Sequence, residues 1–197
     1  MTAPIKDIFW HQGLFLQPQH FQWQERCAQY RLYPQQTYMQ PYFWGFGRLR
    51  IQEGSLKNMM FEVKECEALF RDGTWAVFPG NSELPPRSFK GVWAEDMDQC
   101  FRVYLGLRKL NPDGDNVTVV GRDDEPVQTP TRFVSPADPE EIRDIYKNGP
   151  VARIKLLSHA LRIFWETEIE SAGEYELLPL AQLEFDGNEI VLSRTFV

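Results

Sequence analysis

Residues 99–110 read QCFRVYLGLRKL, and this stretch decides the class of fold. Its apolar side chains recur at every second position, namely at Phe101, Val103, Leu105 and Leu107. Alternation over this length predicts a β-strand with one buried face and one exposed face. We therefore expect a protein that is mainly β.

Similar short patterns lie on both sides of this strand. We expect further strands at 46–52, 60–70, 75–78, 117–120, 177–185 and 190–193. The dipeptides at Asp72-Gly73 and Asp186-Gly187 are typical of hairpin turns, whose central residues favour positive φ. Gly45 and Gly47 predict a bulge or a close backbone approach in the first strand. Short strands separated by turns at this spacing predict an antiparallel sandwich or barrel.

Three stretches between these strands are harder to assign. Residues 79–90 and 121–150 are rich in proline and polar residues, so we interpret both as surface loops, the second with one helical turn at 140–146. Residues 151–165 fit either one helix or two strands, because their apolar spacing matches both periods. We choose two strands, since the neighbouring segments are strand and turn.

The N-terminal part is different in character. Pro18 stands where a helix is expected to begin, and neither Gly nor a further Pro interrupts the chain before Tyr33. At about 100° per residue, this helix has two apolar faces. One face holds Phe21, Ala28 and Leu32, and the other holds Trp23, Cys27 and Tyr30. The helix then lies either between its own domain and a second surface, or between two parts of one core.

Aromatic side chains are concentrated in this N-terminal part, outside the strand pattern. Large apolar patches that stay exposed to solvent mark interaction sites. We therefore predict an interface with another chain. Its candidate residues are Trp10, Phe15, Leu16, Pro18, His20, Phe21, Trp23, Cys27 and Tyr30. The prolines at positions 34 and 41 bound a linker, so we expect an N-terminal region at 1–41 and a β domain at 42–197.

Composition excludes several classes of protein. The chain has 197 residues and a formal net charge of −7, which argues against nucleic acid as the main partner. No run approaches the ~20 apolar residues of a membrane span, and no secretory signal is recognisable. The three cysteines, Cys27, Cys66 and Cys100, are odd in number and widely spaced. We expect them to be reduced and buried, in a cytoplasmic protein.

Residues that would indicate catalysis or a cofactor are missing. The three histidines, His11, His20 and His159, lack the spacing of a zinc site, and we expect His11 and His20 to bond backbone groups instead. Asp72, Asp113, Asp123 and Asp124 lie in predicted turns, which favour Asp for backbone reasons. No phosphate-binding loop, dinucleotide fingerprint or nucleophile elbow occurs. We expect no enzyme, no metal and no cofactor.

Several segments resemble one known family. WHQGLFLQPQHFQ, residues 10–22, resembles the opening signature W-x-E-G-x-x-L-x-P-Q-H-F-Q of the TssK (VasE/ImpJ) family of type VI secretion baseplate proteins. Weaker matches follow in family order, at Tyr42 to Phe46, Asp72 to Thr74, Leu178 to Ala181, and Phe196-Val197. The sequence departs from the family at Gln12, where Glu is usual, and at Arg71, where Pro is usual.

This resemblance implies a fold and a set of partners. It implies an antiparallel β-sandwich, the shoulder region of the family, similar to the shoulder of siphophage receptor-binding proteins and preceded by a helix. It also implies a homotrimer that attaches to the TssF–TssG wedge. The neck and head of the family would follow beyond Val197, and the head would contact the membrane complex. The candidate interface residues would then contact a neighbouring protomer or the wedge.

An alternative function is a carbohydrate-binding β-sandwich. Trp44, Trp75 and Trp93 could then act as stacking platforms, provided that they line one open groove. Packing in a core explains the same aromatic residues, and we favour packing.

Overall fold

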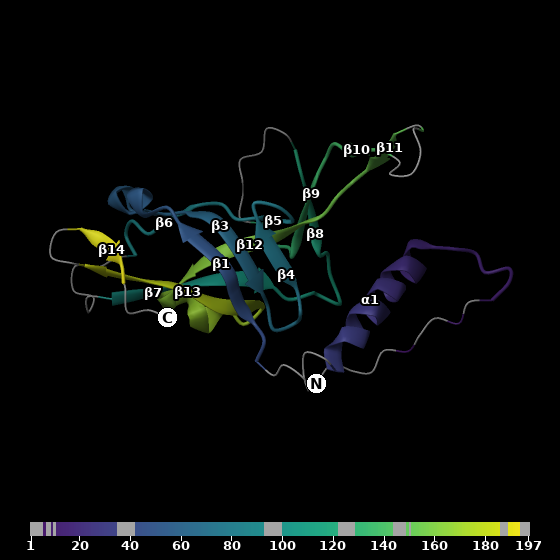
Figure 1. The fold of residues 1–197 in the computed structure, drawn as a ribbon, viewed down its shortest axis with the longest axis horizontal. Helices are drawn as coiled ribbons and strands as arrows, with labels where there is room; N and C mark the ends of the chain where they lie inside the picture. The colour runs from purple at the N-terminus through teal and green to yellow at the C-terminus, as the bar shows by residue number, and fades with distance from the viewer. Residues whose placement is uncertain are drawn as a thin grey trace. The chain divides into compact units, whose positions relative to one another are not determined.

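The computed structural model of the chain describes residues 6, 9, 11–34, 42–92, 100–121, 129–143, 149, 151–185 and 189–193, with the backbone alone at 33 and 34 (Figure 1). Two compact units are distinguished by their internal contacts. The first comprises Met1–Trp44 with Arg71–Thr74, and the second comprises Gly45–Phe70 with Trp75–Val197. The linker was predicted at 33–41, but Tyr33 and Pro34 belong to the N-terminal helix, and 35–41 lie outside the described residues, as does the predicted turn at 186–188.

The first unit contains the predicted helix. Helix α1 spans Pro18–Pro34, so the proline begins the helix as its fixed φ favours. Before it, Gly13 has a φ of 85°, a conformation that suits a residue without a side chain. The helix prediction is therefore confirmed at both ends to within a residue. No helix among the described residues is long and apolar enough to cross a membrane.

The second unit begins with a three-stranded antiparallel sheet. Its strands are β1 (Gly45–Ile51), β3 (Val63–Leu69) and β4 (Trp75–Phe78), in the order β1-β3-β4. Gly47 is skipped where the pairing passes from Phe46 to Arg48, so the predicted bulge is confirmed. The predicted hairpin turn is confirmed as well, since Gly73 has a φ of 85° and the Asp72 carboxylate accepts the Thr74 N–H at 2.9 Å.

The single strand predicted at 60–70 is wrong in detail, because the chain divides there. Strand β2 (Met60–Phe61) pairs with β6 (Arg87–Ser88), whereas β3 pairs with β1 and β4. Lys64 is an extra residue on β3, between the pairs Ile51–Val63 and Arg50–Glu65. This bulge exchanges the two faces of the strand, so the buried side chains are Phe61 and Val63 before it, and Cys66, Ala68 and Phe70 after it.

The second sheet is larger and runs β14-β13-β7-β12-β9-β8, with β5 also paired to β12. Its strands are β7 (Cys100–Arg108), β8 (Val117–Val120), β9 (Phe133–Pro136), β12 (Ser158–Trp165), β13 (Tyr175–Phe185), β14 (Ile190–Leu192) and β5 (Ser82–Glu83). Most neighbours are antiparallel, but β8 pairs with β9, and β5 with β12, in parallel. The predicted antiparallel arrangement is confirmed for the other neighbours, and these two parallel pairings were not predicted.

Both stretches interpreted as loops contain strands. Residues 79–90 hold β5 and β6, with Leu84 and Phe89 buried. Residues 121–150 hold β9 and β10 (Glu140–Ile142), and β10 pairs with β11 (Ala152–Ile154) instead of forming the predicted helical turn. The two-strand interpretation of 151–165 is confirmed by β11 and β12. Two 3-10 helices, η2 (Glu53–Asn58) and η3 (Glu166–Ser171), were not predicted.

The core draws side chains from both sheets, so the second unit is a β-sandwich. The predicted inner face of β7, Phe101, Val103, Leu105 and Leu107, is confirmed as buried. Trp165 of β12 lies among three buried rings, those of Phe61, Phe89 and Phe101, at centroid distances of 6.4, 6.1 and 5.8 Å. The fold is therefore mainly β with an N-terminal helix, as predicted.

Candidate interaction surface

One apolar face of α1 is hydrogen-bonded to Lys6 of its own chain. The Trp23 Nε1–H donates to the Lys6 carbonyl oxygen at 2.7 Å, and the Cys27 thiol donates to the same oxygen at 3.5 Å. Cys27 is 6% exposed and Trp23 is 40% exposed. The guanidinium of Arg26 lies 5.4 Å from the centre of the Trp23 ring. The face of Trp23, Cys27 and Tyr30 thus has an intramolecular partner.

The other face of α1 is open to solvent in the described part of the chain. Phe21 is 58% exposed and Leu32 is 52% exposed, while Ala28 between them is also exposed. Phe15 and Leu16, just before the helix, are 81% and 52% exposed. Large apolar side chains gathered in this way are typical of a surface that another protein covers.

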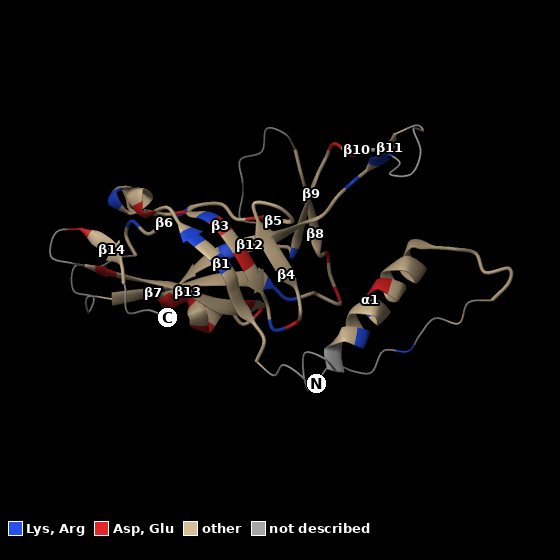
Figure 2. Ribbon diagram, in the orientation of Figure 1, with Lys and Arg blue, Asp and Glu red and all other residues tan. Residues whose placement is uncertain are grey.

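The charge distribution agrees with this assignment. The helix sequence PQHFQWQERCAQYRLYP contains just three charged residues, Glu25, Arg26 and Arg31. Figure 2 shows most of the α1 ribbon without charge. The central parts of protein interfaces are depleted in charged residues, because burying an unpaired charge is costly.

The remaining candidate interface residues are placed as follows. Trp10 lies outside the described residues. Pro18 is the first residue of α1, and the Gln17 N–H donates to His20 Nδ1 at 3.1 Å. His11 Nδ1 lies 3.1 Å from the Gln12 carbonyl oxygen. The two histidines therefore bond backbone groups as predicted, whereas the interface role of the nine residues stays a prediction.

The cysteines and the potential metal ligands were the next candidates for chemistry. Cys27, Cys66 and Cys100 are free thiols, and Cys100 is exposed, so the prediction that all three are buried is wrong. Cys100 is the first residue of β7, on the face opposite Phe101, which explains its exposure. Burial, together with the negative charge of Glu67, raises the pKa of the Cys66 thiol to about 12. No group of three or more metal-ligating side chains occurs among the described residues.

The tryptophans of the alternative function differ in their surroundings. The Arg71 guanidinium lies 4.3 Å from the centre of the Trp44 ring, so this ring already has a stacking partner. Trp75 is 61% exposed, so the packing in a core that we favoured is wrong for this residue, and Trp93 lies outside the described residues. These observations do not favour a carbohydrate platform.

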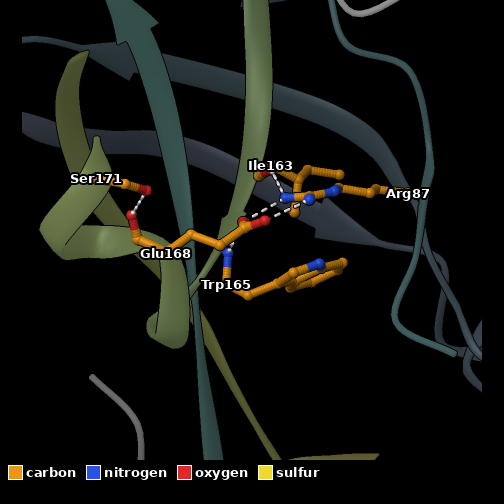
Figure 3. Close-up of polar contacts among 5 residues, drawn as sticks. All are labelled: Arg87, Ile163, Trp165, Glu168 and Ser171. Atoms are coloured by element: carbon orange, nitrogen blue, oxygen red, sulfur yellow. Dashed lines mark hydrogen bonds and ion pairs between the residues drawn. The ribbon is translucent and has the colours of Figure 1, made fainter. Parts of the chain in front are cut away.

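Sequence reasoning missed an ion pair inside the sandwich. The Arg87 guanidinium donates to both carboxylate oxygens of Glu168 at 2.6 Å, and also to the Ile163 carbonyl oxygen at 2.7 Å (Figure 3). Glu168 accepts the Trp165 N–H at 3.0 Å, which caps helix η3, and Arg87 stacks over the Trp165 ring at 4.9 Å. The interval of three residues between Trp165 and Glu168 is a capping-box spacing. The signature was not recognised in the sequence because its N-cap residue is usually Ser or Thr, and here it is Trp.

The ion pair controls the protonation of Glu168. Burial by itself raises the pKa of this carboxyl group. The hydrogen bonds from Arg87 and the Trp165 N–H, together with the charges of Arg87 and Arg162, act in the opposite direction. The net effect holds the pKa of Glu168 below its ordinary value of 4.5.

The class that these features define is a β-sandwich with an N-terminal helix whose apolar face is exposed. Residues 20–197 match the family described as "Bacterial Type VI secretion, VC_A0110, EvfL, ImpJ, VasE". The chain belongs to this family.

One curated protein and two solved structures illustrate what this chain is similar to. The type VI secretion system baseplate component TssK1 of Pseudomonas aeruginosa PAO1 is 27% identical over 180 residues, which are 89% of this chain and 37% of that protein. A chain in the TssK–TssF–TssG baseplate subcomplex, solved by cryo-electron microscopy, has the same fold with a TM-score of 0.81 and 19% identity, over 99% of this chain and 62% of that one. A crystal structure of TssK has a TM-score of 0.75 and 19% identity, over 96% of this chain and 41% of that one.

This chain therefore spans little more than a third of the length of the curated relative. In the family signature, Leu178 to Ala181 lie in β13 and Asp72 to Thr74 form the turn after β3, whereas Phe196-Val197 lie outside the described residues.

Proposed function

We propose that this chain is the shoulder of a trimeric type VI secretion baseplate component, and that it attaches the trimer to the TssF–TssG wedge. Its membership of the VasE family supports a baseplate role, and a similar chain occurs in a TssK–TssF–TssG subcomplex. The role is structural and cytoplasmic. Contact with the membrane complex belongs to the head region that follows in the family.

The observation that best supports attachment through this region is the open apolar face of α1. Phe21 and Leu32 remain more than half exposed, although the opposite face of the same helix is held by Lys6. Burying a Phe or Leu side chain contributes about 1.5–3 kcal/mol. Two such side chains, together with Phe15 and Leu16, can therefore supply a large share of an interface.

The proposal assigns attachment to residues 1–41, and the sandwich domain to residues 42–197. Sedimentation at micromolar concentration tests the trimer: a trimer, or a mixture that shifts with concentration, is expected. A clean monomer at every concentration would mean that this region does not hold the trimer together.

Co-expression with the TssF and TssG proteins of the same organism tests attachment. We expect the tagged chain to capture both proteins, and the double variant Phe21→Ser with Leu32→Ser to lose this capture. The matched control is Gln22→Ser with Gln29→Ser, which changes exposed polar residues of the same helix and should leave capture intact. Failure of the unaltered chain to capture the wedge would overturn the function. Full capture by the Phe21/Leu32 variant would overturn the role of the α1 face.

A further inference from the structure

Strand β4 forms one edge of the three-stranded sheet, and within the described residues it pairs with β3 alone (Figure 1). Its sequence is Trp-Ala-Val-Phe, which carries no charge and consists largely of aromatic and β-branched residues that favour strands. Uncharged segments of this kind on an open sheet edge tend to pair with strands of other chains. A folded chain that keeps β4 at an edge therefore has to protect it.

The opposite edge of the same sheet is protected by its own sequence. Strand β1 is interrupted by the bulge at Gly47, and its exposed side chains include those of Arg48 and Arg50. Bulges and basic side chains both disfavour the addition of a further strand. Strand β4 has a continuous register and no charged residue, so its edge has to be protected in another way.

The side chain of Asn81 occupies the β4 edge. Its Oδ1 accepts the Val77 N–H at 2.7 Å, and its Nδ2 donates to the Trp75 carbonyl oxygen at 2.9 Å. Alternate residues of a strand bond to opposite neighbours, so these two groups face away from β3. A residue of an added parallel strand opposite Ala76 would make the same two bonds. The Asn81 carboxamide is thus a one-residue substitute for a further strand.

Two further contacts hold Asn81 in position. The hydroxyl of the buried Ser82 donates to Asn81 Oδ1 at 2.9 Å, which orients the carboxamide. The Asn81 carbonyl oxygen accepts the His159 N–H of β12 at 2.8 Å. Asn81 therefore bonds the first sheet through its side chain and the second sheet through its backbone.

Gly80 lets the chain approach the edge closely enough for this contact. A methyl group added at Gly80 would lie 3.1 Å from the Val77 carbonyl oxygen, which is tighter than ordinary van der Waals contact. This carbonyl also faces away from β3, because it belongs to the same residue as the N–H that Asn81 binds. The turn between β4 and β5 therefore covers three outward-facing backbone groups of β4.

We propose that the Asn81 carboxamide is an autoinhibitory contact, which closes the β4 edge against strand addition. Its removal frees the Val77 N–H and the Trp75 carbonyl, and the freed edge then pairs with an edge strand of a second copy of this chain. The contact lies wholly within the sandwich, so this inference does not rest on the proposed function.

Sedimentation velocity of the whole chain tests the proposal. Asn81→Ala is expected to form species larger than those of the unaltered chain, in amounts that rise with concentration. The matched control is Asn116→Ala. The Asn116 side chain likewise accepts the N–H and binds the carbonyl of one backbone residue, Asn111, but it does so inside a turn. This control should leave the species unchanged.

Two measurements identify the edge that is responsible. Adding Val77→Pro to Asn81→Ala should abolish the larger species, because proline lacks the outward N–H and is tolerated on edge strands. Hydrogen exchange at a concentration where Asn81→Ala is not associated should be severalfold faster at the Val77 amide than in the unaltered chain. The Ala76 amide, which faces β3, should exchange at an unchanged rate.

Gly80→Ala is a second variant that keeps the carboxamide. Its methyl group forces the turn away from the Val77 carbonyl oxygen, so the same larger species are expected in smaller amounts. The proposal would be overturned by any of three results: no larger species from either Asn81→Ala or Gly80→Ala, equal association of Asn116→Ala, or association that persists after Val77→Pro.

Discussion

Arg87 and Glu168, 81 residues apart in the sequence, form a bidentate ion pair in which the guanidinium Nη1 and Nη2 atoms each lie 2.6 Å from one carboxylate oxygen. The pair links β6, through Arg87, to helix η3, and Arg87 also bonds the Ile163 carbonyl oxygen of β12. Their side chains are 17% and 29% exposed, so solvent screens them far less than it screens surface pairs.

We expect Glu168→Gln to lower the free energy of unfolding by about 2 kcal/mol, because it removes a charge from a hydrogen-bonded, partly buried pair. Urea denaturation measures this change. The matched control is Glu67→Gln, which alters an exposed pair with Arg48 at 3.8 Å and should cost about 0.5 kcal/mol or less. Equal effects of the two variants would show that the Arg87–Glu168 pair contributes no more than a surface contact.

The same carboxylate predicts a pH dependence. Since the pKa of Glu168 is lower in the folded protein, its contribution is complete above its ordinary pKa of 4.5 and is lost as the pH falls through the folded value. The difference in unfolding free energy between the wild type and Glu168→Gln should therefore be constant near neutral pH and shrink below pH 4.5. A difference that grows on acidification would contradict the assignment.

Gly106→Ala should destabilise the sandwich. A methyl group there would meet the Phe164 ring at 2.5 Å, which is far inside van der Waals contact. Overpacking of this kind costs about 1–3 kcal/mol, and thermal unfolding measures it. Phe164→Leu should relieve part of the cost in the double variant. Gly173→Ala is the control, since its added methyl group meets nothing within 4 Å and should be nearly neutral.

Thiol reactivity should distinguish the three cysteines. At pH 8 the folded chain should expose one rapidly reacting thiol, that of Cys100, whereas burial protects Cys27 and holds the pKa of Cys66 at about 12. Titration with a thiol reagent is expected to count three thiols after denaturation. Cys100→Ser should abolish the rapid phase. A disulfide or stoichiometric zinc in the purified chain would contradict the expectation of reduced, metal-free thiols.

Trp23→Ala should weaken assembly more than it lowers the melting temperature of the isolated chain. Trp23 keeps 40% of its surface exposed and bonds the N-terminal segment, so its removal disturbs α1 and not the sandwich core. Aromatic residues at interfaces often cost about 2 kcal/mol or more when cut to Ala. Val103→Ala, at a fully buried position, is the control and should lower stability alone. If Trp23→Ala instead unfolds the whole chain, Trp23 is a core residue and the interface prediction is wrong.

The sequence by itself determined the parts that depend on near neighbours. The alternation at Phe101 to Leu107, the start of α1 at Pro18 and the turn at Asp72-Gly73 were all predictable, because periodicity, a fixed φ and a positive φ act within a few residues. The aromatic surface of α1 was recognisable for the same reason, since its residues share one helix. The opening signature also indicated the family to which the chain belongs.

Tertiary structure alone decided the features that depend on distant segments. Strands β5, β6 and β10 have two or three residues each, too few for periodicity, and form because another strand supplies their hydrogen bonds. The bulge at Lys64 reverses which side of β3 is buried, and its position depends on pairing with β1. Arg87 pairs with Glu168 because the packing of the strands places β6 next to η3. No local sequence pattern predicts that these two elements are neighbours.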